Sequence, residues 1–140
     1  MFNRIFNSIC AIALVSIASV AYANYQVSPV KLVLDKKERI TSLHFKNEGT
    51  TAKNLQVKIL KRDASKPGKV YVPSKDLIVS PVMFKVLPNR AQLIRIAIKN
   101  FKAKSEKDDY RVSIKEVPQG PAEEGKVRFV TEMSVPIKIN

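Results

Sequence analysis

The chain has 140 residues and a formal net charge of +13, because 25 Lys and Arg residues outnumber 12 Asp and Glu residues. Its only cysteine, Cys10, lies in an apolar N-terminal stretch, so we expect a mature domain without disulfides, thiol chemistry or cysteine-ligated metals. The positive charge favours anionic partners such as lipopolysaccharide, anionic lipid or the carboxylates of another protein, unless it serves only solubility.

Residues 1–23 have the pattern of a secretory signal peptide. MFNR supplies a positive charge, ICAIALVSIASVA forms the apolar region, and Ala21 and Ala23 are small residues at the positions that a signal peptidase reads. A retained membrane anchor would need roughly 20 apolar residues and usually a charged stop behind them. We therefore expect cleavage after Ala23, a periplasmic domain over residues 24–140, no stable membrane insertion and no nucleic-acid partner.

Apolar and polar residues alternate along the mature chain, and helical periodicity is almost absent. Turn residues such as Asn47-Glu48-Gly49 and Leu87-Pro88-Asn89 separate the alternating segments. Seven segments are predicted as strands: 26–35, 40–47, 54–63, 75–81, 91–100, 109–118 and 126–140. This spacing predicts an all-β fold, a single immunoglobulin-like seven-stranded β-sandwich.

The last predicted strand, KVRFVTEMSVPIKIN, has one apolar face. Every second residue from Val127 to Ile139 is apolar except Thr131. The residues between them include charged and polar ones, among them Lys138. A strand with one apolar face and a free edge is an aggregation hazard that proteins normally conceal. Its presence at the end of the chain raises the question of what it pairs with.

Catalytic patterns are missing from the sequence. His44 is the single histidine and has no motif around it, and the adjacent acids Asp108-Asp109 and Glu123-Glu124 point different ways on an extended chain. Zincin, nucleophile-elbow and phosphate-loop patterns are absent as well. We expect a protein that is not an enzyme and needs no cofactor, metal or nucleotide.

Two stretches of the sequence, taken in their order along the chain, resemble a known family. LIVSPVMFKVLPNRAQLIRIAI (77–98) and YRVSIKEVPQGP (110–121) resemble the N-terminal immunoglobulin-like domain of the periplasmic chaperones of chaperone–usher pilus assembly, the PapD-like chaperones. The order and spacing of the similar elements persist from about Val27 to Ile139. The resemblance implies a PapD-like sandwich and a tight, cis proline turn at Ser80-Pro81.

In that family, the chaperone lends its terminal strand to a pilus or fimbrial subunit that lacks its own last strand. Two basic residues hold the carboxyl terminus of the subunit, and the resemblance assigns these anchors to Lys31 and Lys138. It implies exported pilin-type subunits as clients and an outer-membrane usher as a further partner, and the open edge also allows self-association. It assigns the donated side chains to Val127, Phe129, Thr131, Met133 and Val135.

The sequence departs from the family pattern at several positions. Lys31 stands where the family usually has arginine, Thr131 fills a groove less well than a large aliphatic residue, and Pro136 lacks a backbone donor. The sequence ends at Asn140, where the family continues into a second immunoglobulin-like domain, so we expect a single-domain protein.

Two other functions fit part of the pattern. One is a structural pilin-like or surface adhesion module, although the first predicted strand begins too close to Asn24 for an obvious donor extension. The other is a basic envelope protein that binds polyanions, for which KILKRDASKPGK (58–69) is the best basic segment.

Overall fold

The computed structural model describes residues 24–99 and 109–140, so the predicted signal peptide lies outside the described residues. In this part of the chain two sheets pack as an all-β sandwich, which confirms the predicted fold class. The described residues contain ten strands: β1 (Tyr25–Ser28), β2 (Leu32–Leu34), β3 (Ile40–Asn47), β4 (Lys53–Arg62), β5 (Tyr71–Pro73), β6 (Leu77–Ser80), β7 (Met83–Val86), β8 (Ala91–Ile98), β9 (Tyr110–Val117) and β10 (Glu132–Ile139).

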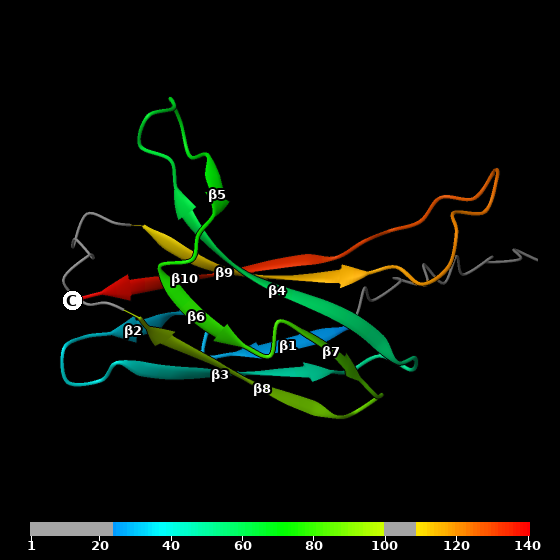
Figure 1. Cartoon of the computed structure of the whole chain (residues 1–140). Helices are drawn as coiled ribbons and strands as arrows, with labels where there is room; N and C mark the ends of the chain where they lie inside the picture. The colour runs from blue at the N-terminus through cyan, green and yellow to red at the C-terminus, as the bar shows by residue number, and fades with distance from the viewer. Residues whose placement is uncertain (1–23, 100–108) are drawn as a thin grey trace, which may run out of the picture.

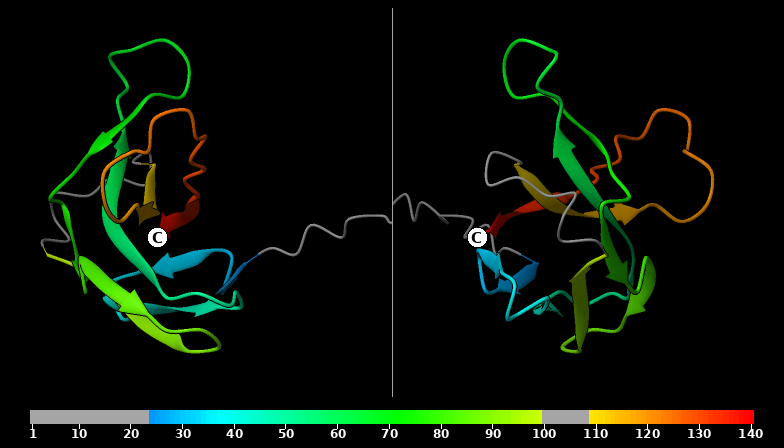
Figure 2. Two further views of the ribbon diagram at one scale, coloured as in Figure 1. Left: turned by 90° about the vertical axis from the view of Figure 1, so that its right-hand side faces the viewer. Right: turned by 60° about the vertical axis from the view of Figure 1, so that its left-hand side comes forward.

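The two sheets contain four and six strands (Figure 1). The smaller sheet has the order β1-β3-β8-β6, and the larger sheet has the order β2-β10-β9-β4-β5, with β7 also paired to β4. Among the paired strands of the described chain, only β2 and β10 run parallel to each other. Figure 2 shows the two layers edge-on.

At two prolines, one inside a predicted strand and one at the end of another, the chain crosses from one sheet to the other within a few residues. β1 pairs with β3 in one sheet, whereas β2 pairs with β10 in the other, and Pro29 lies between them. In the same way β6 pairs with β8 and β7 pairs with β4, on either side of Pro81. The bonds Ser28-Pro29 and Ser80-Pro81 are both cis, which confirms the prediction made for Ser80-Pro81.

The two crossings account for two of the three strands beyond the seven predicted, and β5 is the third. The predicted strand 26–35 is divided into β1 and β2, the segment at 75–81 is followed by β7, and β5 has too short a pattern to be recognised. Alternation identifies the faces of a strand, but it carries no information about which sheet the next few residues join.

Inward-facing side chains of both sheets form one continuous apolar core. Three aromatic rings cross it, with the Tyr25 and Phe45 centroids 5.0 Å apart and those of Phe45 and Phe84 5.7 Å apart. Each aliphatic or aromatic side chain that is fully buried contributes about 1.5–3 kcal/mol. The most completely buried apolar residues are Leu32, Leu34, Leu43, Phe45, Leu55, Ile94, Ile96, Tyr110, Val112 and Ile114.

The last strand is shorter than predicted, because β10 begins at Glu132 and residues 126–131 are not part of it. The prediction of a strand over 126–131 is therefore wrong for this conformation. Continuing the register past the Glu132–Lys115 pair would oppose residues 126–131 to the segment from Glu116 to Pro121. That segment contains Pro118, which lacks an N–H, and Gly120, which has a left-handed φ of 75°, so the ladder stops.

No helix in residues 24–99 and 109–140 is long and apolar enough to cross a membrane.

Candidate functional site

The edge of β10 is only partly covered. On one side, Glu132–Ile137 pair with β9. On the other side only Ile137–Ile139 pair, with β2, and within the described chain no strand pairs there with Glu132–Pro136. The first half of β10 therefore has backbone N–H and C=O groups available to an added strand.

The segment before β10, residues 126–131, carries apolar side chains that are exposed to solvent. Val127 is 80% exposed and Phe129 is 87% exposed, although side chains of this type usually lie in a core. The segment projects beyond the sandwich in orange (Figure 1). It is tied back by the Arg128 guanidinium, whose Nη1 and Nη2 donate to the carbonyl oxygens of Gly120 at 3.1 Å and Pro121 at 2.9 Å. The apolar side chains are thus presented at the surface on a braced loop.

The side chains predicted to be donated differ in how far they are buried. Val127, Phe129 and Thr131 are exposed, whereas Met133 is half-buried and packs against the core. Val135 is 5% exposed and belongs to the core of this domain. The five residues thus run from fully accessible at the loop to fully buried near the end of the chain.

Lys31 and Lys138 lie on the same outward face of the larger sheet. Lys138 pairs with Val33 in the parallel ladder, and Lys31 is one residue before β2. The residues on either side of Lys138, Ile137 and Ile139, are buried, so the Lys138 side chain points away from the core. Within residues 24–99 and 109–140 neither lysine has an ion-pair partner, and both are exposed.

Arg111 is a residue that sequence reasoning missed. It lies on β9 as the partner of Pro136 in the antiparallel ladder. Its neighbours Tyr110 and Val112 are buried, so its side chain is on the outward face of the larger sheet. Its guanidinium carbon lies 5.3 Å from the centroid of the Tyr71 ring, and its Nη1 donates to Ser134 Oγ at 3.3 Å. The only signal in the sequence was its place among the polar residues that alternate with apolar ones along β9. Many solvent-exposed residues have the same pattern.

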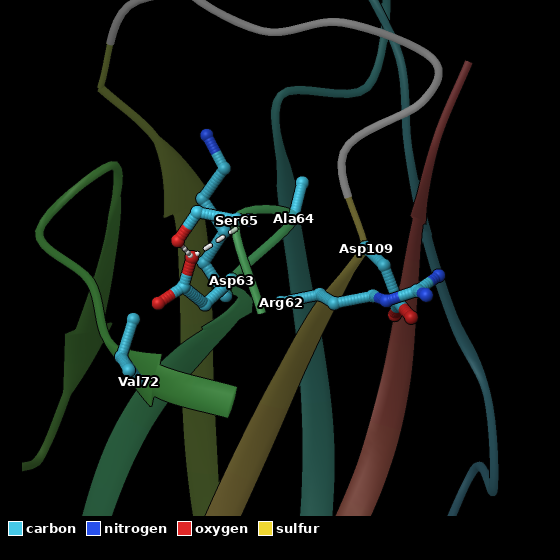
Figure 3. Close-up of a pocket in the computed structure, with 7 residues that line it drawn as sticks. Arg62, Asp63, Ala64, Ser65, Val72 and Asp109 are labelled. Carbon is cyan, nitrogen blue, oxygen red and sulfur yellow. Dashed lines mark hydrogen bonds between the residues drawn. The ribbon is translucent and has the colours of Figure 1, made fainter. Parts of the chain in front are cut away.

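A hollow of about 700 Å³ opens beside the β4–β5 hairpin and the start of β9 (Figure 3). Its carboxylates are already engaged. Asp63 accepts hydrogen bonds from the Ser65 hydroxyl at 2.5 Å and from the Ser65 backbone at 3.0 Å, which lowers the pKa of Asp63. Asp109 accepts from the Tyr71 hydroxyl at 2.5 Å, and the described residues contain no group of acids, histidines or cysteines that could hold a metal.

The fold is shared with solved pilus chaperones. The structure matches the complex of the CsuC chaperone with the CsuE tip adhesion subunit from the Csu pili of Acinetobacter baumannii, with a TM-score of 0.69 and 19% identity, covering 84% of this chain and 56% of that chain. The periplasmic chaperone SfaE matches with a TM-score of 0.63 and 14% identity, covering 82% and 56% of the two chains.

A third match is the complex of the SafA pilin of Salmonella enterica with the SafB chaperone, with a TM-score of 0.56, 15% identity, and coverage of 82% and 52%. This chain spans about half the length of the solved chaperones that it matches. A search of the curated proteins finds no match.

The family model of the pili and flagellar-assembly chaperone, PapD N-terminal domain, matches residues 24–139, which confirms the resemblance found in the sequence. The match covers both sheets, β10 with its open edge, and the positions of Lys31 and Lys138. The chain therefore belongs to the PapD N-terminal domain family of pilus-assembly chaperones, a family of chaperones and not of enzymes.

Proposed function

We propose that this protein is a periplasmic chaperone that binds pilus or fimbrial subunits with an incomplete fold and stabilises them by lending its terminal strand. Family membership supports the general role. Two relatives have been solved with a tip adhesion subunit or a pilin bound, which supports subunits of this kind as clients. The relative SfaE is a periplasmic chaperone, and the signal-peptide pattern of residues 1–23 supports the same location here.

The observation that carries the proposal is the open edge of β10 together with the exposed apolar segment before it. A client strand adds to the free backbone groups of Glu132–Pro136, and it extends along residues 126–131 as they straighten. Val127 and Phe129 then enter the apolar groove that the client's missing strand leaves open. Their burial stabilises the complex by roughly 25 cal/mol per Å² of apolar surface removed from water.

Lys31 and Lys138 would hold the carboxylate at the end of the client chain. Both are exposed and lie on one face beside the end of β10. An exposed ion pair contributes only about 0–1 kcal/mol, so the lysines would set the register of the client strand more than its affinity. An outer-membrane usher remains a proposed further partner, and pairing of two β10 edges is the proposed state without a client.

The experiment is capture of proteins from a periplasmic extract by the tagged protein, beside a Lys31→Ala/Lys138→Ala double variant. Lys69→Ala/Lys75→Ala is the matched control, because it removes the same charge from two exposed lysines elsewhere. We expect a small β-rich subunit to be retained by the wild type and the control in high salt and lost from the Lys31/Lys138 variant. Binding that disappears in salt and ignores Lys31 and Lys138 would instead support the polyanion-binding alternative.

A further inference from the structure

Arg111 on β9 and Pro136 on β10 are ladder partners, and Lys31 comes directly before β2 on the other side of β10. Leu32 is the partner of Ile137, so continuing the β2–β10 register by one residue would place Lys31 beside Pro136 on its other side. Strands are about 4.8 Å apart, which separates the backbones of Arg111 and Lys31 by roughly 10 Å. The short proline ring lies between them, so two long cationic side chains can reach the same anion above it.

Lys138 completes this arrangement from the next outward position of β10. Outward residues along a strand are two positions apart, or about 7 Å, so Lys138 lies diagonally from both Arg111 and Lys31. The three side chains thus surround Pro136 on the outer face of the six-stranded sheet.

The Arg111 guanidinium is held in place but is not neutralised. Its position is set by the Tyr71 ring and the Ser134 hydroxyl, and its Nε is buried without an acceptor. Within the described chain no carboxylate forms an ion pair with it. The two acids nearest along the face accept from hydroxyl groups instead, Asp109 from Tyr71 and Glu132 from Ser113 at 2.6 Å.

A buried donor without an acceptor is costly, and it is more costly on a charged group. Because Nε is buried, a ligand carboxylate would meet the guanidinium at its Nη atoms, which can donate two parallel N–H···O bonds. Lysine offers only a point charge, so Arg111 is the one member of the three that can fix the orientation of a carboxylate.

We propose that Arg111 is a third cation of the carboxylate site, in which it binds the client's terminal carboxylate by its guanidinium while Lys31 and Lys138 supply flanking charge. This assignment rests on the proposed chaperone function for the identity of the ligand, but the site itself can be tested without a client.

The first test uses acetate as the probe and the wild-type protein, followed by the ¹H–¹⁵N resonance of Arg111 Nε. At constant ionic strength with chloride as the balancing anion, we expect a saturable shift of that resonance. The Arg95 Nε resonance is the internal control, because Arg95 is exposed on β8 in the other sheet, and we expect no saturation there. A Lys31→Gln/Lys138→Gln variant should weaken the acetate affinity read at Arg111 at least threefold. Arg111 and Arg95 shifts that are equally small and linear would overturn the proposal.

The second test is client capture by Arg111→Gln and Arg111→Lys, with Arg95→Gln as the matched control and thermal unfolding to verify folding. We expect at least a tenfold loss of client binding with Arg111→Gln. The loss should be smaller with Arg111→Lys, which keeps the charge but not the planar group that donates two parallel hydrogen bonds. If the client is retained by Arg111→Gln but lost from the Lys31/Lys138 variant, the role of Arg111 is refuted and the chaperone function stands. If wild type captures no client, the function fails, and the acetate titration still decides the site.

Discussion

The Tyr25 hydroxyl donates a hydrogen bond of 2.9 Å to Glu116 Oε2, which joins the first strand of the smaller sheet to β9 of the larger one. The other carboxylate oxygen of Glu116 forms an ion pair of 2.9 Å with Lys53 of β4. Three strands that are far apart in the sequence thus meet at one end of the sandwich, next to the braced loop before β10.

Replacing Tyr25 with phenylalanine should remove this bond and keep the packing of the ring on Phe45. We expect the free energy of unfolding to fall by about 1–2 kcal/mol, because the acceptor is charged but remains paired with Lys53. Urea unfolding measures the change. Glu116→Ala should cost more, since it leaves both donors without their acceptor, and a neutral Tyr25→Phe would show that the bond contributes nothing.

Stability at alkaline pH should depend on Tyr25. Burial, followed by the hydrogen bond to Glu116, raises the pKa of Tyr25 above its ordinary value of 10.0. The unfolded chain therefore loses this proton at a lower pH than the folded chain. The associated stability is present below about pH 10 and is lost as the pH rises further. Unfolding of wild type and Tyr25→Phe from about pH 9 to about pH 11 should show the steeper loss in wild type. Parallel curves would contradict this expectation.

Phe129 and Val135 should separate client binding from folding. Phe129→Ser removes an 87% exposed ring, so we expect a change in unfolding free energy within about 0.5 kcal/mol. Client capture should fall at least about tenfold, because burying a phenylalanine is worth more than the 1.4 kcal/mol that this factor represents. Val135→Ala should instead destabilise the domain by about 2 kcal/mol through a cavity in its core. A Phe129→Ser variant with full client capture would exclude this side chain from the interface.

Asn47 is fully buried and connects the loop after β3 to the end of β7. Its Nδ2 donates to the carbonyl oxygens of Thr51 at 2.8 Å and Val86 at 3.2 Å, and its Oδ1 accepts from the Gly49 amide at 2.9 Å. Asn47→Ala should lower the free energy of unfolding by about 3 kcal/mol, because it leaves buried polar groups without partners. Asn47→Asp should be at least as damaging, since a carboxylate would face two carbonyl oxygens. Chemical denaturation tests both, and a loss below about 1 kcal/mol would indicate that water replaces the side chain.

Much of the candidate site could be predicted from alternation and family resemblance. The outward direction of Lys138 followed from its parity between Ile137 and Ile139, and the exposure of Phe129 was consistent with a donated strand. The roles of these residues remain predictions until a client is captured. The start of β10 at Glu132 was missed, because it depends on Pro118 and Gly120 in the opposing segment and not on residues 126–131 themselves.

By itself the sequence determined the all-β class, the inward and outward faces of the strands and the family, because a period of two assigns each side chain to one face before any partner is known. Only the tertiary structure decided that β1 and β2 join different sheets, that β10 has one half-open edge, and that Arg111 is the ladder partner of Pro136. These relationships arise from pairings between segments distant in the chain, whose register is set by packing of the whole core.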